Sequence, residues 1–334
     1  MPIGLPRRRR RSPWRPVIRA AAGAALAAAI AVPLARRRLR INPAVTVLAT
    51  ASGPFALAVL FPRTRTRDVA IFVLQMWAFT VVHEMPYDQP DRLRERLRVR
   101  YPIAVDRALG AGELPNVRLQ RALSRPGQVT RLDRLLASVH WAWFIEPYAA
   151  LVWILLRDER RFPSAARQMA VAFDIGCTIY YAVPTAPPWW AAENGYVAEQ
   201  EGPESEHLVA SAATPHQLRR VMVEVGEGTW GRAWPALYAS LGGNPWAAMP
   251  SLHFATSLLA AILLSESGTV PGVAGWSYAA TLGLALVYLG EHYVIDLLVG
   301  AGVVAAVRRG EPLARPVAEA VSAFVQRLEA VANS

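Results

Sequence analysis

Long apolar segments with few charges limit the fold of this 334-residue chain more than any other feature of its sequence. Several approach the ~20 residues that a helix needs to cross a bilayer. Lipid cannot satisfy exposed backbone groups, and the segments lack the alternation of apolar and polar residues that barrel strands show. We therefore predict an all-α fold, a polytopic transmembrane helical bundle with about six to eight spans. The segments lie at about residues 17–35, 43–62, 69–84, 135–156, 168–187, 252–266, 273–291 and 293–308.

The composition agrees with a membrane protein and excludes several kinds of chemistry. Hydrophobic residues make up 53% of the chain and charged residues 18%, whereas an average soluble domain is roughly a quarter charged. All 36 basic residues are arginines, so a lysine Schiff base, a lysine general base and a phosphate-loop lysine are excluded. The net charge is +11, and the arginines lie between the apolar segments. At these positions, contact with lipid headgroups explains the basic charge better than binding to nucleic acid does. The single cysteine, Cys177, allows neither an internal disulfide nor a cysteine-based zinc site.

The pattern divides the chain into three parts. We predict a basic N-terminus with one or two apolar membrane segments over residues 1–68, a membrane bundle over 69–310, and an amphipathic tail over 311–334. Two polar stretches interrupt the bundle. Residues 85–134 are expected to contain an amphipathic surface helix, although a solvated face without a ligand explains their pattern as well. Residues 188–249 are expected to form an extramembrane loop.

The placement of arginines predicts the orientation of the C-terminal half. Arginines between 157 and 167 and at 308–309 follow apolar segments, and short arginine-rich connections face the cytoplasm. Counting spans from these connections places the loop 188–249 on the outer face. The arginines between 36 and 40, and those of region 85–134, conflict with this count, and an error of one span in the N-terminal half relieves part of the conflict.

Two histidines stand at the ends of apolar segments, where ionisable groups are functional candidates. Asp296 follows His292 by four residues, so on a helix its carboxylate can accept a hydrogen bond from one imidazole nitrogen and fix the tautomer. The other nitrogen then keeps its lone pair as a nucleophile or base. Two expected spans separate His292 from His253, so an out-and-back hairpin returns both to one membrane face. The alternative is a structural pair that stabilises helix packing.

Four short motifs in this region resemble a known family. Residues 250–253 (Pro-Ser-Leu-His) and 288–300, which contain Gly-Glu-His-Tyr-Val-Ile-Asp, look like the paired signature of the type 2 phosphatidic acid phosphatase superfamily. Residues 184–190 (Pro-Thr-Ala-Pro-Pro-Trp-Trp) and 244–249 (Asn-Pro-Trp-Ala-Ala-Met) resemble elements of its inositol phosphorylceramide synthase branch. The resemblance covers about residues 135–308, and the order and spacing of the motifs make it more specific than any motif alone.

The resemblance implies a fold and a role for each matching residue. The bundle would contain a six-helix phosphatase-like core. His292 would attack phosphorus to form a phosphohistidine, and Asp296 would orient it and stabilise its positive charge. His253 would protonate the leaving oxygen and later activate water or an acceptor hydroxyl. Ser251 and nearby backbone amides would hold phosphate oxygens, with no metal and no cofactor.

The sequence also departs from the phosphatase signature. Leu286 stands six residues before His292, where phosphatases of the superfamily usually have an arginine, and the element with a lysine and an Arg-Pro pair is missing. The synthase branch also lacks that arginine, so Leu286 favours this branch. A phosphorylated substrate still needs cations that neutralise its transition state. The candidates are Arg219, Arg220 and Arg232, or arginines of region 85–134 folded over the site.

Several other polar and aromatic residues are candidates for substrate contacts. We predict that Asn244 and Trp189 bind substrate, although a tryptophan at this position also fits an aromatic belt at the membrane interface. His140, Glu146 and Asp174 lie in apolar segments, where they either contact a substrate headgroup or make interhelical hydrogen bonds.

Together these features predict an integral membrane phosphoesterase or phosphotransferase that acts on a lipid-linked phosphate, a phospholipid or a polyprenyl phosphate. A lipid hydroxyl as acceptor gives a synthase that transfers a headgroup such as phosphoinositol, and water gives a lipid phosphatase. A non-catalytic scaffold or lipid carrier is the alternative of another class. The expected location is the cell membrane, in several passes, with the site on the extracytoplasmic face; the sequence predicts no oligomeric state.

Overall fold

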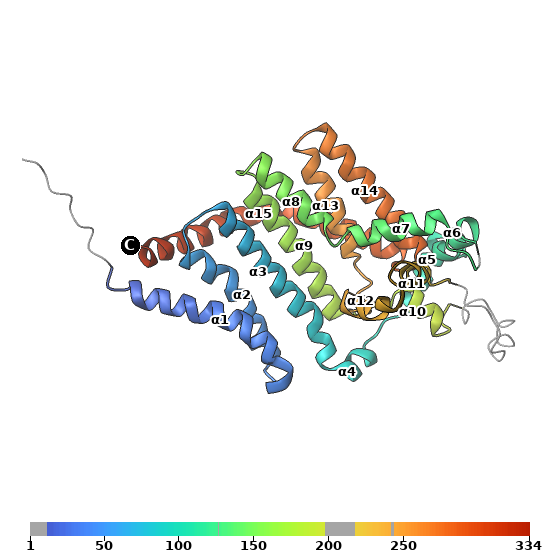
Figure 1. Cartoon of the computed structure of the whole chain (residues 1–334), viewed down its shortest axis with the longest axis horizontal. Coiled ribbons are helices and arrows are strands. Elements are labelled where there is room, and N and C mark those ends of the chain that lie inside the picture. The colour runs from blue at the N-terminus through green and yellow to red at the C-terminus, as the bar shows by residue number, and fades with distance from the viewer. Residues whose placement is uncertain (1–11, 126, 198–217, 242–243) are drawn as a thin grey trace, which may run out of the picture. The chain divides into compact units, whose positions relative to one another are not determined.

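The computed structural model describes residues 12–125, 127–197, 218–241 and 244–334. The regular structure of these residues is helical, which confirms the all-α fold class (Figure 1). The first residues of the basic N-terminus and the middle of the extramembrane loop lie outside the described part. Contacts divide the chain into two units, one made of Met1–Met85 with Arg309–Ser334 and the other of Pro86–Arg308.

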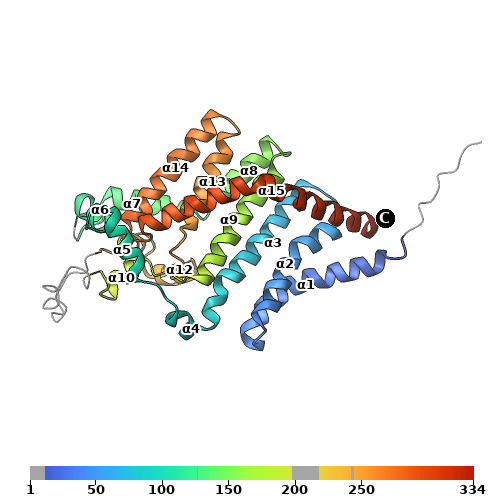
Figure 2. The ribbon, with the colours of Figure 1, turned by 180° about the vertical axis from the view of Figure 1, so that it is seen from behind.

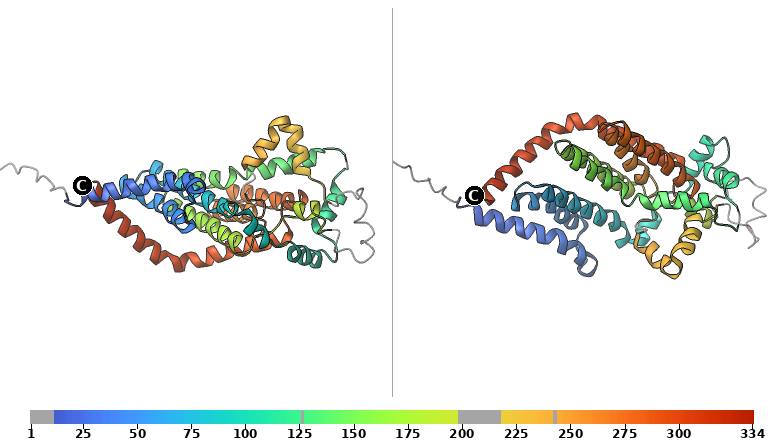
Figure 3. Two further views of the ribbon diagram at one scale, coloured as in Figure 1. Left: turned by 90° about the horizontal axis from the view of Figure 1, so that it is seen from below. Right: turned by 45° about the horizontal axis from the view of Figure 1, so that its top comes forward.

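The first unit contains three long apolar helices. They are α1 (Arg15–Leu39), α2 (Pro43–Leu60) and α3 (Arg65–Glu84). They pack in chain order, α1 on α2 and α2 on α3, and lie side by side in Figure 2 and in the right-hand view of Figure 3. A Cβ on Gly53 of α2 would come within 2.9 Å of the Cβ of Ala29 on α1, and such small-residue contacts are typical of helices packed in lipid. Because α3 packs on α2, the contacts divide the chain after Met85 rather than after residue 68.

Four helices of the described part are long and apolar enough to cross a membrane, namely α1, α2, α3 continued to Asp88, and α14 (Thr269–Tyr288). A fifth span is obtained if α7 (Arg131–Ala142) and α8 (Glu146–Arg157), which are bent by 54° against each other, count as one. The count is lower than the expected six to eight. One of the expected segments, 252–266, forms α13 (Leu252–Ser265), which has only 14 residues. These apolar helices identify a membrane protein.

The second unit is built around the antiparallel hairpin of α13 and α14 (Figure 1). Helices α8 and α9 (Phe162–Ala182) pack on α13, while α7 packs on α14. The contact with α9 depends on Gly176, because a Cβ there would come within 2.5 Å of the Leu252 side chain. The last helix, α15 (Val294–Ala332), begins in this unit, and its residues from Arg309 belong to the first unit.

Region 85–134 differs from the expected amphipathic surface helix. It forms a short 3-10 helix followed by three short helices, α4 (Pro90–Glu95), α5 (Arg100–Leu109) and α6 (Pro115–Leu123). Several of their apolar residues face inward: Leu93, Ile103 and Leu114 are buried in one hydrophobic cluster with Trp246 and Tyr293. Charged residues interrupt the region in the sequence, but its apolar side is part of the protein core.

The described parts of loop 188–249 are also folded. They form α10 (Pro188–Glu193), α11 (Val221–Trp230), a 3-10 turn (Gly231–Ala233) and α12 (Trp234–Leu241). Val221, Met222 and Val225 of α11 are buried against Leu136 of α7 and Tyr288 of α14. The loop therefore packs on the end of the hairpin where α14 leads into α15.

The tail 311–334 continues helix α15 to Ala332. Leu313 and Val317 expose 81% and 66% of their surface, and Phe324 exposes 59%. Their spacing of four and seven residues places these apolar side chains on one side of the helix, which gives the tail an amphipathic face.

Candidate active site

The structure brings together the two histidines and the aspartate that the sequence singles out. His253 Nδ1 lies 3.2 Å from His292 Nε2, and His292 Nδ1 lies 3.3 Å from the Oδ2 atom of Asp296. His292 and Asp296 are buried, with 4% and 0% of their surface exposed. The second nitrogen of His292 therefore faces His253 rather than open space. If His292 donates its Nδ1 proton to Asp296, Nε2 is an acceptor and His253 donates its Nδ1 proton to it.

Ser251 positions His253 at the beginning of α13. Its hydroxyl accepts a hydrogen bond from the backbone N–H of Phe254 at 3.2 Å and so caps the helix. Its own backbone N–H donates to the carbonyl of Asp296 at 2.9 Å, which ties the start of α13 to the first turn of α15. This close approach needs Gly300, because a Cβ at that position would come within 2.8 Å of the Ser251 carbonyl oxygen. The matched glycine thus has a packing role.

A tight turn between α14 and α15 carries His292. The backbone N–H groups of Glu291 and His292 both donate to the carbonyl of Leu286, at 3.0 and 3.2 Å. Gly290 has a φ of +76°, and a Cβ there would come within 2.5 Å of Leu218. The side chain of Leu286 is fully buried, so the position that holds an arginine in the phosphatase signature is part of the core here.

Sequence reasoning missed Asp106, which caps the helix that carries Asp296. Its two carboxylate oxygens accept hydrogen bonds from the backbone N–H groups of Val294, at 2.7 Å, and Ile295, at 2.9 Å. A carboxylate at a helix N-terminus satisfies free donors and interacts favourably with the helix dipole. Burial nevertheless raises the pKa of Asp106 to about 6, although the two backbone hydrogen bonds oppose the shift. No sequence signal distinguishes this aspartate from the other charged residues of its region.

Two amide side chains of α6 hold the other side of the same turn. The Asn116 side-chain amide donates to the carbonyls of Val287, at 2.8 Å, and His292, at 2.9 Å. The Gln120 amide donates to the carbonyl of Tyr288 at 2.8 Å and accepts from the backbone N–H of Arg219 at 2.7 Å. Their spacing of four residues behind a proline places them on one helix face, which is the only sequence signal that points to them.

Arg220 and Trp189, both candidates from the sequence, contact each other beside this turn. The Arg220 guanidinium lies 3.9 Å from the centre of the Trp189 ring and forms an ion pair with Glu193. The backbone N–H of Trp189 donates to the carbonyl of Gly290 at 3.0 Å. Burial raises the pKa of Glu291, and the positive charge of Arg220 partly opposes that rise. A cation is thus held next to the segment that carries His292.

The structure gives Arg219 a different role from its neighbour. Its guanidinium is hydrogen-bonded to Glu224 and lies 3.5 Å from the carboxylate of Asp133. The hydrogen bond to Glu224 is the main reason why the pKa of Arg219 is raised. These two carboxylates balance the positive charge of Arg219 within the folded loop. Arg232, the third candidate, is exposed in the 3-10 turn.

The two motifs on which the synthase resemblance rests are bonded to each other. The backbone N–H of Thr185 donates to the carbonyl of Trp246 at 2.9 Å, and that of Ala248 donates to the carbonyl of Thr185 at 3.2 Å. Asn244 supports this pairing, since its side-chain oxygen accepts from the backbone N–H of Trp246 at 3.0 Å. Residues 184–190 and 244–249 therefore form one structural element that leads into Ser251 and His253.

The structure gives different surroundings to two polar residues of the apolar segments, Glu146 and His140. Glu146 accepts an interhelical hydrogen bond from Ser257 of α13 at 3.0 Å. The ring of His140, in contrast, stacks on that of His253, with 4.8 Å between the ring centres. His140 thus belongs to the histidine site, while Glu146 links two helices.

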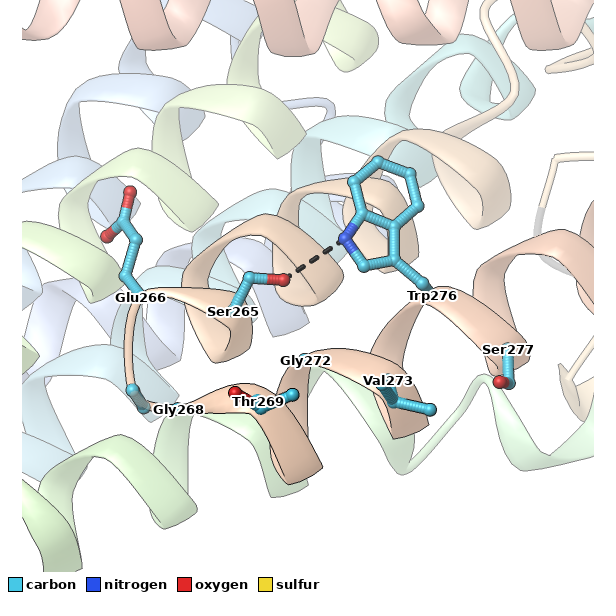
Figure 4. A pocket seen from close by; sticks show the side chains of 9 residues that line it. Ser265, Glu266, Gly268, Thr269, Gly272, Val273, Trp276 and Ser277 are labelled. Atoms are coloured by element: carbon cyan, nitrogen blue, oxygen red, sulfur yellow. Dashed lines mark hydrogen bonds between the residues drawn. The ribbon is translucent and has the colours of Figure 1, made fainter.

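A surface hollow occupies the opposite end of the hairpin. It is lined by Ser265 and Glu266 at the end of α13 and by Gly272 and Trp276 of α14, and the Trp276 indole N–H donates to the Ser265 hydroxyl at 3.1 Å (Figure 4). The length of α13 places it roughly 20 Å from His253. The hollow is therefore separate from the histidine site.

Comparison with protein families identifies a superfamily. A model of the PAP2 superfamily matches residues 103–308, more than half of the chain. Comparison with curated proteins and with solved structures gave no significant match. The matched segment begins upstream of Asp106 and contains the whole histidine site with the residues that hold its turn. Members of the superfamily are generally phosphatases or phosphotransferases. The chain therefore belongs to the PAP2 superfamily.

Proposed function

We propose that this protein is an integral membrane enzyme that acts on a lipid-linked phosphate through a phosphohistidine on His292. The observation that carries the proposal is the continuous contact from Asp296 through His292 to His253. An oriented imidazole with a second histidine at its other nitrogen provides a nucleophile and a proton donor within one site.

The first half of the reaction forms the phosphohistidine. Asp296 holds the Nδ1 proton of His292, and the Nε2 lone pair attacks phosphorus while the bond to the leaving oxygen breaks. That oxygen takes a proton from His253, which must carry a proton on both ring nitrogens beforehand and is neutral afterwards. The substrate phosphate enters between the two rings and replaces their direct contact. The negative charge of Asp296 stabilises the positive charge that develops on His292.

The second half transfers the phosphoryl group to an acceptor. Neutral His253 takes a proton from the acceptor hydroxyl as its oxygen attacks phosphorus. The N–P bond breaks, and its electron pair returns to Nε2 of His292, so both histidines regain their starting state. Water as acceptor gives a lipid phosphatase, whereas a lipid hydroxyl gives a transferase.

Arg220 is the cation that we assign to the substrate phosphate. It is held beside the His292 turn by the Trp189 ring and by Glu193, and a phosphate can compete with Glu193 for the guanidinium. We assign Trp189 to the same substrate side, because its backbone N–H donates to Gly290 of the turn and its ring packs on Arg220. Ser251 and Asn244 shape the backbone next to the site, Ser251 by capping α13 and Asn244 by its hydrogen bond to the backbone N–H of Trp246.

Within the superfamily we favour a transferase of the inositol phosphorylceramide synthase type. The pairing of residues 184–190 with 244–249 supports this choice, because both motifs of that branch meet next to the site. The buried Leu286 supports it as well, since the phosphatase arginine has no counterpart there. A headgroup such as phosphoinositol on a phospholipid donor fits the proposal, and a polyprenyl phosphate is the second donor class. We place the enzyme in the cell membrane with its site on the extracytoplasmic face.

A donor and acceptor panel tests the proposal. The detergent-solubilised protein is incubated with phospholipid and polyprenyl phosphate donors, with and without a hydroxylated lipid, and products are identified by mass spectrometry. A new headgroup-bearing lipid supports the transferase, and free phosphate alone supports the phosphatase. His292→Ala should abolish both products, while the control His83→Ala, in the other unit, should not. Unchanged turnover in His292→Ala refutes the mechanism.

A further inference from the structure

Two aromatic side chains from the end of α7 lie against His253. The ring centre of Trp143 is 4.1 Å from that of His253, and the ring centre of His140 is 4.8 Å away with the two imidazole planes 29° apart. The backbone N–H of Trp143 donates to the carbonyl of His140 at 3.2 Å, so one helical turn presents both rings. Neither residue is part of the histidine motifs that mark the site in the sequence.

The position of the indole is fixed relative to α13. The Nε1–H group of Trp143 donates to the Thr256 hydroxyl at 2.9 Å, and that hydroxyl in turn donates to the carbonyl of Leu252 at 2.7 Å. Leu252 is the residue before His253, so these hydrogen bonds hold the indole against the turn of α13 that carries the imidazole. The ring cannot move away from His253 without breaking them.

His140 presents a neutral ring to His253. It is buried, with 8% of its surface exposed, and its Nδ1 atom has no hydrogen-bond partner in the described part of the chain. A charged imidazolium at this position would leave a buried N–H group without an acceptor, which disfavours the charged form. A neutral imidazole places a π face, and no competing positive charge, beside His253.

We infer that Trp143 and His140 form an aromatic platform that stabilises the protonated form of His253 and keeps it positioned to protonate the leaving oxygen. A cation on an aromatic face is attracted by the ring electrons, most strongly by tryptophan. The inference rests on the proposed function, because it assigns positioning residues to the acid of that mechanism. It explains how a half-buried histidine keeps the second proton that its role as an acid requires.

Other titratable groups lie on the elements around α13, and their charges also act on His253. They are His140 of α7, Glu146 of α8, Asp174, Cys177 and Tyr180 of α9, Tyr278 of α14, and His292 with Asp296 on the turn and on α15. Of these, His292 and His140 contact the His253 ring directly.

Two substrates with different leaving groups test whether the platform supports the acid or only packs against it. An alkyl phosphate ester needs a proton on its leaving oxygen, whereas a nitrophenyl ester leaves without one. We expect Trp143→Leu to lower the first-turnover rate about tenfold on a lipid-like alkyl ester and less than about twofold on the nitrophenyl ester. Trp143→Phe, which keeps an aromatic face, should retain most of the rate on both. Trp276→Leu, in the hollow at the other end of the hairpin, is the matched control.

His140 provides an independent pair of variants. We expect His140→Phe to resemble the wild type and His140→Leu to lose rate selectively on the alkyl ester, and this pair decides the question if Trp143→Leu does not fold. Equal losses on both esters, or no loss on either, overturn the platform. His253→Ala separates this inference from the proposed function. A selective loss in His253→Ala without one in the platform variants refutes only the platform, whereas an equal loss on both esters in His253→Ala refutes the assignment of His253 as the acid.

Discussion

At the scale of single residues, the proposed chemistry depends on three side chains that the sequence identifies and on a cation that the sequence does not single out. His253, His292 and Asp296 are recognisable because their spacing and their membrane context are unusual for polar groups. Choosing between Arg219 and Arg220 requires the structure, since adjacent arginines are equivalent in the sequence. Only the contacts show that Arg219 is held by Asp133 and Glu224, whereas Arg220 lies beside the His292 turn.

These adjacent arginines give a prediction with an internal control. We expect Arg220→Ala to lower kcat/KM for a phosphorylated lipid about 100-fold, because the phosphate loses its cation in the transition state. We expect Arg219→Ala to lower the melting temperature instead, since it leaves the buried carboxylate of Asp133 without its cation, while kcat/KM of the folded protein stays within about threefold. Steady-state kinetics and thermal unfolding in detergent measure both. The opposite distribution of the two effects contradicts the assignment of Arg220 to the substrate.

At the scale of elements, the largest difference from the sequence-based expectation is region 85–134. Its charges and its spaced apolar residues predict an amphipathic surface helix, but the apolar side packs into the core and three polar side chains hold the turn of His292. Single-sequence patterns report which face of a helix is apolar and not what covers it. A buried side chain that bonds to backbone groups, such as Asp106, leaves no periodic signal of its own.

The cap of α15 gives a prediction about pH. The folded-state pKa of Asp106, about 6, lies above the ordinary value of 3.8, so the folded protein binds this proton more tightly than the unfolded chain does. The contribution of Asp106 to stability is therefore largest below pH 4 and is lost as the pH rises through 6. We expect the melting temperature of the wild type, minus that of Asp106→Asn, to decrease between pH 4 and pH 7. Thermal unfolding in detergent across this range tests it, and a constant difference contradicts it.

The contact between α13 and α15 gives a second prediction at this scale. A Cβ at Gly300 would come within 2.8 Å of the Ser251 carbonyl oxygen, so Gly300→Ala must separate the two helices that carry His253 and Asp296. We expect kcat to fall about 10- to 100-fold, because small misplacements of catalytic groups are costly. Gly302→Ala is the matched control, since a Cβ there meets nothing within 4 Å. Equal activity of the two variants in the donor assay means that the close contact does not position the site.

At the scale of the whole molecule, the sequence predicts an all-α membrane protein because hydropathy and the cost of unsatisfied backbone in lipid leave few alternatives. The sequence places the segment from residue 69 in the main bundle, whereas the contacts group α3 with α2. Number and length of spans depend on breaks such as that between α7 and α8, and hydropathy alone does not locate these.

The orientation of the chain is the prediction that belongs to this scale. With Cys177 replaced by serine, a single cysteine is introduced at Glu227, on the exposed side of α11, or at Glu159, in the exposed connection between α8 and α9. We expect a membrane-impermeant maleimide to label Glu227→Cys in intact cells and Glu159→Cys only after permeabilisation, because short arginine-rich connections of membrane proteins generally face the cytoplasm. The reverse pattern contradicts an extracytoplasmic site.

The central claim is a covalent phosphoryl group on His292, and trapping it is the most direct test. A donor labelled in its phosphoryl group is mixed with the enzyme, the reaction is stopped within one turnover under alkaline conditions, and the modified peptide is located by mass spectrometry. The mechanism predicts an acid-labile, alkali-stable label on His292, absent in His292→Asn and present in His83→Asn. Full turnover by His292→Asn, or a label on another residue, would contradict the account.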